Sequence, residues 1–312
     1  MTDKYLVMTP QDAMRLAGVF VDDDNQELNV VIKYRKEQKR KIEINGNTKK
    51  TARDLMGQIP VVFVCPDDIS IVKGGSQERR SFVNKILCQV DLNYLTSLAS
   101  HNKILRQKSA ALKSNKVIDK TMIETFNHMI SPHIKEICRA RHDFVETIKP
   151  MVKSAHAKMS SDTEIVELEY QSQFNDKSID ESLARFLPEE ILARRVRSGS
   201  HRDDLDFHIN EKSLKKYGSQ GQIKTFLYAL KLAEFEFLYS HLNKKPILIL
   251  DDIFEKLDQS RLDILLGLII NGYFAQVFIS DTELTRTKKI LEGHNLPFDT
   301  FQVTSGQINK VK

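Results

Sequence analysis

The chain has 312 residues, of which 41% are hydrophobic and 29% are charged, and it contains 12 glycines and 8 prolines. This composition is typical of one large or two ordinary folded domains, and it excludes collagen-like, low-complexity and disordered proteins. No apolar run reaches the roughly 18 residues that a membrane span needs. The first residues do not combine a basic stretch with an apolar block, so no secretory signal is visible.

The three cysteines are widely separated, at Cys65, Cys88 and Cys138. An odd, scattered set fits neither a disulfide framework nor a zinc site. Together with the missing secretory signal, this pattern favours a reducing compartment. We therefore expect a cytoplasmic protein that does not insert into a membrane.

The positive charge is unevenly distributed along the chain. The formal net charge is +5, yet residues 76–150 contain 13 Lys or Arg and 7 Asp or Glu, and all other residues together contain 34 and 35. A basic region beside a neutral one is typical of a polyanion-binding surface. A solvated, lysine-rich helical face would give the same counts, so charge alone leaves both interpretations open.

The first seventy residues favour strands. Residues 29–34 form a β-rich run, and residues 41–44 alternate charged and apolar side chains. Asn45 and Gly46 then signal a turn. The apolar run 60–65 is bounded by prolines, which predicts a short buried strand.

Residues 78–149 favour helices. Apolar residues recur at helical spacing over 86–112, and a second apolar stripe covers 122–137. Such stripes are typical of packing between long helices. We expect Pro132 to kink the second helix or to mark its start, and Pro150 to end it.

From residue 165 onwards, strands and helices alternate. We expect strands at 165–170, 205–209, 246–250 and 276–280, and helices at 180–197, 222–242 and 260–270. Strands, then a helical block, then alternating elements indicate a discontinuous α/β domain with a helical insertion. The predicted parts are residues 1–75, the helical domain 76–160 and residues 161–312, and segment 178–198 could belong to the helical domain.

Two carboxylates follow the apolar run 246–250. A buried strand would deliver Asp251 and Asp252 to the carboxyl edge of the sheet, where α/β proteins bind ligands. In P-loop nucleotidases the first acid of such a pair helps to hold Mg²⁺, and the second could polarise an attacking water. Strands that end in aspartate are common, but Leu257 and Asp258, six residues further on, strengthen the functional interpretation.

The segment from Gly218 to Gln222 opens a predicted long helix. Ser219 can act as the N-cap, and Gln222 three residues later completes a capping box. Either a well-capped helix or an anion site explains the segment, because glycines expose backbone N–H groups and the helix dipole favours anions there. The segment is not a P-loop, because its second glycine does not directly precede Lys224.

A short turn ahead of the strand at 205–209 is crowded with polar residues: Gly199, Ser200, His201, Arg202, Asp203 and Asp204. A surface turn with internal salt bridges explains this segment best. No Ser or Cys stands in a strained elbow, so a catalytic triad is not supported.

A G-x-x-x-x-G-K-[ST] motif does not occur in the 312 residues. Gly74 and Gly75 are followed by Ser76 and Gln77, which fails the pattern. The phosphate-cradling loop that the Asp251 strand would serve is therefore not found. We expect the 312-residue chain on its own to bind ATP weakly or not at all.

Taken together, these motifs resemble the bacterial RecF family of DNA repair proteins, which are SMC-like ABC ATPases. Residues 64–68, 72–76 and 79–82 resemble the segment that leads into the family's helical arm, although Asn84 stands where Asp is expected. Residues 105–109 resemble its Gln-Arg-Asn segment with two departures. Residues 199–204 resemble its Gly-Pro-His-Arg-Asp-Asp segment, with Ser200 in place of proline.

The second half of the chain carries the ATPase part of the resemblance. Residues 219–222 match the ABC signature motif, residues 250–252 match Walker B, and residues 255–258 match the D-loop. Family members also open with a Walker A segment, and Met1 to Phe20 resembles the part of the family that follows it. The order and spacing of these motifs agree over nearly the whole chain.

The resemblance implies a fold and a mechanism. The fold is α/β, an ABC-type P-loop ATPase-like domain that is discontinuous and has an inserted α-helical arm domain. Two protomers sandwich ATP and Mg²⁺, so that a homodimer clamps DNA until slow hydrolysis releases it. RecO and RecR are the implied partners in recombinational repair.

The resemblance also assigns roles to residues. Asp251 would hold Mg²⁺, Asp252 would lie at the hydrolytic position, and Leu257 and Asp258 would form the D-loop. The strand end at 276–281 would carry the switch region. The partner's γ-phosphate would be contacted in trans by Ser219, Gln220, Gly221 and Gln222.

The implied nucleic acid is single-stranded or gapped DNA. The candidate contacts are cations of the helical insertion: Arg79, Arg80, Lys103, Arg106, Lys108 and Lys113. Two other function classes stay open. The chain could be a fragment or pseudo-ATPase that only binds DNA or protein, or a Mg²⁺-dependent nuclease that uses Asp251 and Asp252 with Asp203 and Asp204.

Overall fold

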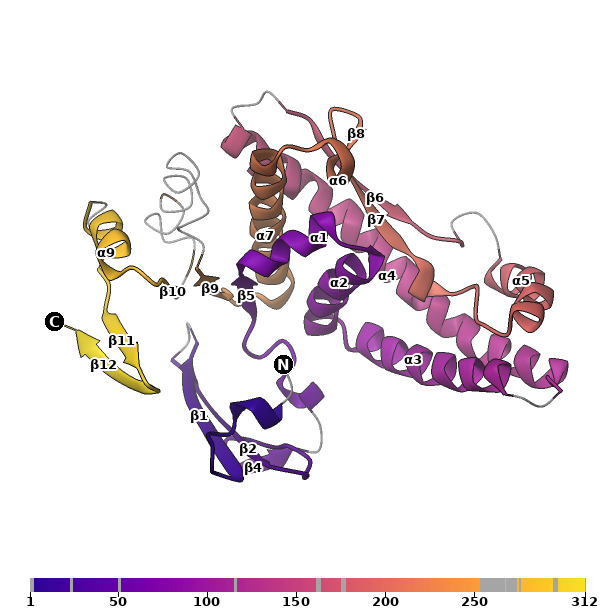
Figure 1. Cartoon of the computed structure of the whole chain (residues 1–312), viewed down its shortest axis with the longest axis horizontal. Helices are drawn as coiled ribbons and strands as arrows, with labels where there is room; N and C mark the ends of the chain where they lie inside the picture. The colour runs from indigo at the N-terminus through magenta and orange to yellow at the C-terminus, as the bar shows by residue number, and fades with distance from the viewer. Residues whose placement is uncertain are drawn as a thin grey trace.

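The computed structural model describes residues 3–22, 25–49, 52–114, 117–160, 164–174, 178–252, 267, 274, 276–293 and 297–311. A small parallel sheet and an elongated helical arm pack against the helix α7 (Gln220–Leu242), and an N-terminal sheet lies apart from this helix (Figure 1). No described helix is long and apolar enough to span a membrane.

The N-terminal sheet is antiparallel and follows a short 3₁₀ helix, η1 (Asp3–Leu6). Its strands β1 (Ala13–Val21), β2 (Glu27–Arg35), β3 (Lys41–Ile44) and β4 (Asn47–Lys49) pair in sequence order. The turn between β3 and β4 has positive φ at both Asn45 (48°) and Gly46 (77°). Two residues with positive φ define the hairpin turn that Asn-Gly favours, so the predicted turn is confirmed.

The small sheet is parallel and has the order β10-β9-β5. The elements are β5 (Val61–Val64), β9 (Ile247–Asp251) and β10 (Val277–Ser280). Val62, Val64, Leu248 and Leu250 are buried in one core cluster with the apolar side chains of α7. The register pairs Val64 with Leu250 and Asp251 with Ser280, so the three strands end at a common carboxyl edge.

Three helices build the arm: α2 (Ser76–Val90), α3 (Leu92–Lys113) and α4 (Lys120–Ser160). The carboxylate of Asp91 caps α3 by accepting hydrogen bonds from the backbone N–H groups of Asn93 and Tyr94. A fourth helix, α5 (Ile179–Ala193), packs on the same helices, since Leu183 clusters with Ile104 and Leu187 with Leu112. Helix α5 therefore shares apolar contacts with the helices of the arm.

The expected helix end at Pro150 is wrong. Pro132 and Pro150 both lie inside α4, which continues to Ser160. A proline inside a helix removes a hydrogen bond and clashes with the preceding turn. Buried residues on both sides of Pro150, such as Ile148 and Val152, are packed in the main core and hold the helix together across it.

A second antiparallel sheet lies along α4 and consists of β6 (Val166–Gln171), β7 (Asp204–Ile209) and β8 (Lys212–Ser213). The short helix α6 (Leu214–Tyr217) leads from β8 into α7, and α9 (Leu284–Gly293), β11 (Thr300–Thr304) and β12 (Gln307–Val311) follow β10. Four short connecting helices complete the described elements: η2 (Ala52–Leu55), η3 (Pro66–Asp68), α1 (Ile69–Lys73) and η4 (Ser200–Arg202). The helix expected at 260–270 lies outside them, apart from Gly267.

Candidate functional site

Asp251 and Asp252 lie at the carboxyl edge of the parallel sheet, as predicted. The Ser280 hydroxyl donates a hydrogen bond to Oδ1 of Asp251, and the backbone N–H of Asp252 donates to the carbonyl of Ser280 (3.2 Å). Asp252 has a positive φ of 51°, an uncommon conformation for a residue other than glycine. Its Oδ1 is buried and has no hydrogen-bond partner among the described residues.

The next acid along the edge starts another helix. Oδ1 of Asp281 accepts a hydrogen bond from the backbone N–H of Glu283 (3.0 Å), and Oδ2 accepts one from the Thr287 hydroxyl (2.5 Å). Asp281 is therefore fixed at the start of α9. Asp251, Asp252 and Asp281 thus lie at or directly after the ends of two neighbouring strands, but the described residues hold no cluster of three acids that could by itself bind a metal ion.

A buried cation connects this edge to the middle of α7. Nζ of Lys231 lies 3.5 Å from Oδ2 of Asp68, which follows β5, and 3.2 Å from Oε2 of Glu234. Burial raises the pKa of Glu234, and the charge of Lys231 opposes that shift. Lys231 thus links the middle of α7 to the segment that follows β5.

The signature segment begins α7 with the predicted capping box. The Ser219 hydroxyl accepts a hydrogen bond from the backbone N–H of Gln222 (3.2 Å), and Oε1 of Gln222 accepts one from the backbone N–H of Ser219 (2.8 Å). The side-chain amide of Gln222 also donates to Oε1 of Glu164 (2.8 Å). Glu164 in turn lies 3.5 Å from Nε2 of His156 on α4, so the turn is attached to the base of the arm.

The structure does not bring the signature segment and Asp251 together. Ser219 precedes Lys231 by twelve residues of continuous helix, which corresponds to roughly 18 Å along the helix axis. Gln220 and Gly221 begin the helix beside Ser219. The predicted D-loop residues Leu257 and Asp258 lie outside the described residues. The two parts of the predicted ATPase site are therefore separate within one chain.

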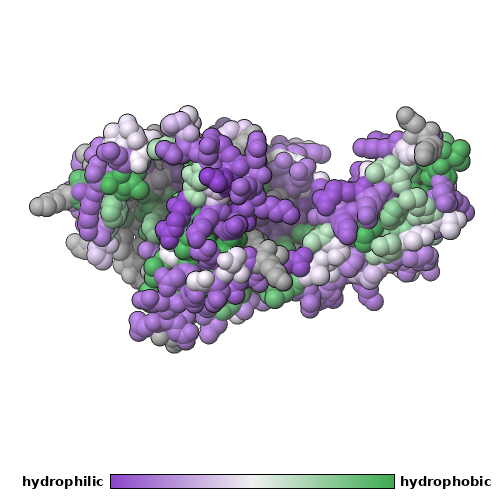
Figure 2. Space-filling model, turned by 90° about the horizontal axis from the view of Figure 1, so that it is seen from below, coloured by the Kyte–Doolittle hydropathy of each residue, from purple (hydrophilic) through white to green (hydrophobic). Residues whose placement is uncertain are grey.

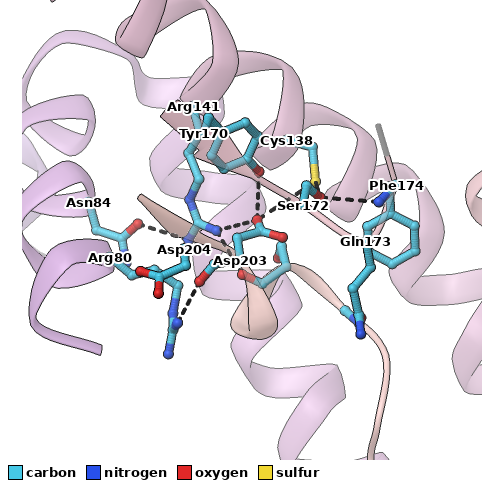
Figure 3. A network of polar contacts seen from close by, with 12 residues as sticks. Arg80, Asn84, Cys138, Arg141, Tyr170, Ser172, Gln173, Phe174, Asp203 and Asp204 are labelled. Atoms are coloured by element: carbon cyan, nitrogen blue, oxygen red, sulfur yellow. Dashed lines mark hydrogen bonds and ion pairs between the residues drawn. The ribbon is translucent and has the colours of Figure 1, made fainter. Parts of the chain in front are cut away.

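The turn at 199–204 is the centre of a buried polar network (Figure 3). Arg141 of α4 donates to Oδ2 of Asp203 (2.6 Å), to the carbonyl of Ser200 (2.7 Å) and to Oδ1 of Asn84 (3.1 Å). The Tyr170 hydroxyl also donates to Oδ2 of Asp203 (2.6 Å). Asp203 is fully buried, so this turn is internal and the predicted surface turn is wrong. Its two acids pair with Arg141 and Arg79 of the arm helices and not with cations of the turn itself.

Two histidines extend the network towards α3. The rings of His101 and His201 have centroids 6.3 Å apart, and Nε2 of His101 lies 3.1 Å from the Ser200 hydroxyl. Burial lowers the pKa of His101 to about 4 and that of His201 to about 3. Both rings are therefore neutral near pH 7, and the network joins arm and β6–β7 sheet without further charge. Arg202 donates to the carbonyl of Val196 (3.3 Å).

The predicted DNA-contacting cations fall into two groups. Lys108 is 1% exposed, and its ammonium lies 2.6 Å from Oε2 of Glu190 and donates to Asn127 (2.6 Å). Arg79 is 7% exposed and binds both carboxylate oxygens of Asp204 (2.7 and 2.9 Å). Half-buried Arg80 donates to the backbone carbonyl of Asp203 (2.6 Å). These contacts favour structural roles for the three residues.

The second group is available at the surface. Lys103, Arg106 and Lys113 are exposed on α3. Their spacing of three and seven residues places them on one side of the helix, because an α-helix repeats every 3.6 residues. These three cations stay candidates for contact with DNA.

Sequence reasoning missed Arg141, Tyr170, Glu164 and Ser280. Their partners are between 29 and 62 residues away in the chain, so local spacing carries no signal for these contacts. A weak signal existed for Arg141 only, since a cation on the apolar stripe of a helix requires a buried counter-charge.

The sequence of the chain is similar to those of named bacterial proteins. No family model matches the chain. The chain is 31% identical over 307 residues to the DNA replication and repair protein RecF of Porphyromonas gingivalis, covering 98% of this chain and 84% of the relative. It is 34% identical over 292 residues to the protein of that name from Flavobacterium johnsoniae, covering 91% and 81%.

Solved structures share the fold. A structure of the recombination mediator protein RecF-ATPrS superposes with a TM-score of 0.87 at 24% identity, covering all of this chain and 84% of the other. An SMC head bound to the C-terminal winged-helix domain of ScpA gives a TM-score of 0.53 at 13% identity, covering 97% and 74%. The predicted fold class, an ABC ATPase-like α/β domain with a helical insertion, is confirmed.

Proposed function

Because the chain belongs to the RecF family of DNA replication and repair proteins, we propose that it binds DNA and acts as a dimer in which each protomer completes the other's nucleotide site. ATP with Mg²⁺ is the proposed cofactor. Single-stranded or gapped DNA in the cytoplasm is the proposed substrate in recombinational repair, with RecO and RecR as partners. The RecF structures similar to this chain are of a mediator in the RecFOR pathway, which supports these partners.

One observation carries the dimer proposal. The capping turn at Ser219 begins α7, whereas the segment that follows β5 at the sheet edge contacts α7 at Lys231, roughly half the length of the helix further on. A single nucleotide cannot contact both in one chain. Two chains related by a twofold axis would satisfy both half-sites at once, because the same pair of surfaces is used twice.

The residues at the sheet edge fit Mg²⁺–ATP. Asp252 has a buried oxygen without a partner among the described residues, and the Ser280 hydroxyl orients Asp251. We infer that Asp251 holds the metal and that Asp252 accepts a hydrogen bond from the attacking water. When bound, Mg²⁺–ATP supplies the phosphoryl group whose hydrolysis releases the dimer.

The signature turn fits the γ-phosphate from the other protomer. Ser219, Gln220, Gly221 and Gln222 form the N-terminus of a helix of 23 residues, where the macrodipole and exposed N–H groups favour an anion. Glu164 fixes the Gln222 side chain and so holds the capping box in one geometry. We infer that this turn contacts the γ-phosphate bound by the partner.

The nuclease hypothesis is not supported. It required Asp203 and Asp204 beside Asp251, but these residues lie before and at the start of β7 in a different sheet. Arg141 and Arg79 neutralise them. The RecF relatives do not favour a nuclease either.

Sedimentation velocity tests the dimer proposal, in a version of the chain that carries a Walker A segment. Ser219→Arg places bulk and charge at the turn, and we expect it to abolish ATP-dependent dimerisation while the monomer stays folded. Ser219→Ala is the matched control, since it removes the cap at a cost of about 0.5–2 kcal/mol without adding bulk. Dimerisation of the arginine variant at the parental ATP concentration would contradict the assignment.

A further inference from the structure

Four cations share one side of the N-terminal sheet. The register places Arg15 opposite Lys33 and Lys33 opposite Lys41 on three neighbouring strands, and Arg35 lies two residues beyond Lys33 on β2. All four side chains are exposed. Because side chains alternate along a strand, the buried residues Val30, Ile42 and Ile44 occupy the other side. We name Arg15, Lys33, Arg35 and Lys41 the basic sheet face.

This arrangement is unfavourable for the isolated protein. Directly opposed residues in antiparallel strands have Cβ atoms about 4.5–5.5 Å apart, and like charges at that distance destabilise the sheet. Glu43 relieves part of the repulsion, since its Oε1 lies 2.6 Å from Nζ of Lys33. No ion pair within the described residues involves Arg15, Arg35 or Lys41. A bound polyanion would relieve the remaining repulsion.

The same region holds the net charge of the whole chain. Residues 33–41, which cover the end of β2, the following turn and the start of β3, contain six Lys or Arg and one acid, Glu37. All other residues together contain 41 basic and 41 acidic side chains. Seen from below, hydrophilic residues cover much of the molecule's visible surface (Figure 2).

The helical arm has less unpaired positive charge than its composition indicates. Three of its cations, Arg79, Lys108 and Arg141, pair with acids outside residues 76–150. The excess of six positive charges over that segment thereby falls to three. The same count applied to residues 33–41 also leaves an excess of three, because Lys33 and Lys36 pair with Glu43 and Asp12 outside that segment. This excess lies within nine residues, whereas that of the arm is spread over residues 76–150, so the positive field that a polyanion meets is more concentrated at the N-terminal sheet.

We propose that the basic sheet face binds the phosphate backbone of duplex DNA, in a sequence-independent manner. The inference rests on the proposed DNA-binding function and assigns it a surface. Duplex DNA is favoured over single strands because stacking of bases needs aromatic side chains, and the nearby aromatic residues of the described strands, Phe20 and Tyr34, alternate onto the other side of the sheet. Lysine and arginine without base-reading side chains contact phosphates, which position DNA and carry no sequence information.

Two triple variants of equal charge test the assignment. Arg15→Gln, Arg35→Gln and Lys41→Gln neutralise the sheet face, and Lys103→Gln, Arg106→Gln and Lys113→Gln neutralise the exposed stripe of α3. Fluorescence anisotropy would measure binding of the 312-residue chain to a labelled duplex of about 30 base pairs from about 50 to 200 mM KCl. We expect the sheet variant to raise Kd at least about tenfold and to lower the slope of log K against log salt by about 2–3. The arm variant should change both less.

Thermal unfolding provides the control for folding. Removal of opposed like charges should leave the melting temperature of the sheet variant unchanged or raise it, which a structural role for these residues would not do. A sheet variant with the parental Kd and salt slope, or a larger effect of the arm variant, would overturn the inference. So would a loss of affinity for a single-stranded oligonucleotide without a loss for the duplex. If the parent chain itself bound no duplex at any salt concentration, the proposed DNA-binding function would fail and the inference with it.

Discussion

Two pairs of neighbouring aspartates, Asp203–Asp204 and Asp251–Asp252, have opposite surroundings. The first pair is neutralised within the protein, by Arg141 and Arg79. For the second pair no ion pair is recorded among the described residues, and one buried oxygen of Asp252 has no hydrogen-bond partner there. This difference shows that two neighbouring aspartates are candidates for catalysis when the surrounding residues provide no counter-charge.

Replacement of Arg141 should have the largest effect on stability. Arg141→Ala leaves the carboxylate of Asp203 buried without its cation, which costs about 3–5 kcal/mol in comparable pairs. Arg139→Ala, on the same helix, is the matched control, because Arg139 pairs with Glu136 and Asp143 at the surface and its loss costs about 1 kcal/mol or less. Urea unfolding measures both. Equal effects would show that the buried network does not stabilise the junction between the arm and the β6–β7 sheet.

The junction should also be sensitive to acid. His101 has a folded pKa of about 4, lowered by burial, against roughly 6.5 in an unfolded chain. The unfolded state therefore binds more protons in this range, and stability falls as the pH drops from about 6.5 towards 4. The expected loss from His101 is roughly 2 kcal/mol between pH 7 and pH 5.

A matched pair of variants separates this effect from general acid unfolding. His101→Gln should weaken the pH dependence of the unfolding free energy between pH 7 and pH 5 by roughly 2 kcal/mol, and the part due to His201, whose pKa burial lowers to about 3, should remain. His142→Gln alters an exposed ring on α4 and should leave it unchanged. If the unfolding free energy of the His101 variant depended on pH as strongly as that of the parent, the interpretation of His101 as a buried, neutral ring would be wrong.

The same substitution in each aspartate pair gives the sharpest contrast. Asp203→Asn should destabilise the protein by several kcal/mol, on the order of the Arg141 variant, because a buried guanidinium loses its counter-charge. Asp251→Asn should change the free energy of unfolding by less than about 1 kcal/mol, since the residue is only half-buried and keeps an acceptor for Ser280. It should nevertheless abolish ATP turnover in a version that carries a Walker A segment. Parental turnover would show that Asp251 does not organise the metal.

Local patterns predicted much of the fold. Continuous apolar runs located β5 and β9, the pair Asn45 and Gly46 located a hairpin turn, and the capping box located the start of α7. Each of these signals acts between residues a few positions apart, so the sequence contains it directly. The helix end at Pro150 failed because tertiary packing of α4 overrides the local penalty.

The candidate site was only partly predictable. Asp251, Asp252 and Ser219 follow from a strand end and a helix start. The burial of Lys108 and the pairing of Asp203 with Arg141 depend on which helices meet, and no spacing within one segment encodes that. The row of opposed cations on β1–β3 likewise requires the strand register, which composition cannot supply.

Complementation between two inactive variants tests the central claim, that each protomer completes the other's nucleotide site. In versions that carry a Walker A segment, Ser219→Arg retains its carboxylates and Asp251→Asn retains its signature turn. A heterodimer of the two has one intact composite site, so an equimolar mixture should regain roughly a quarter of the parental ATPase rate if subunits mix freely and sites act independently. No recovery in mixtures that form heterodimers would contradict a site shared between protomers.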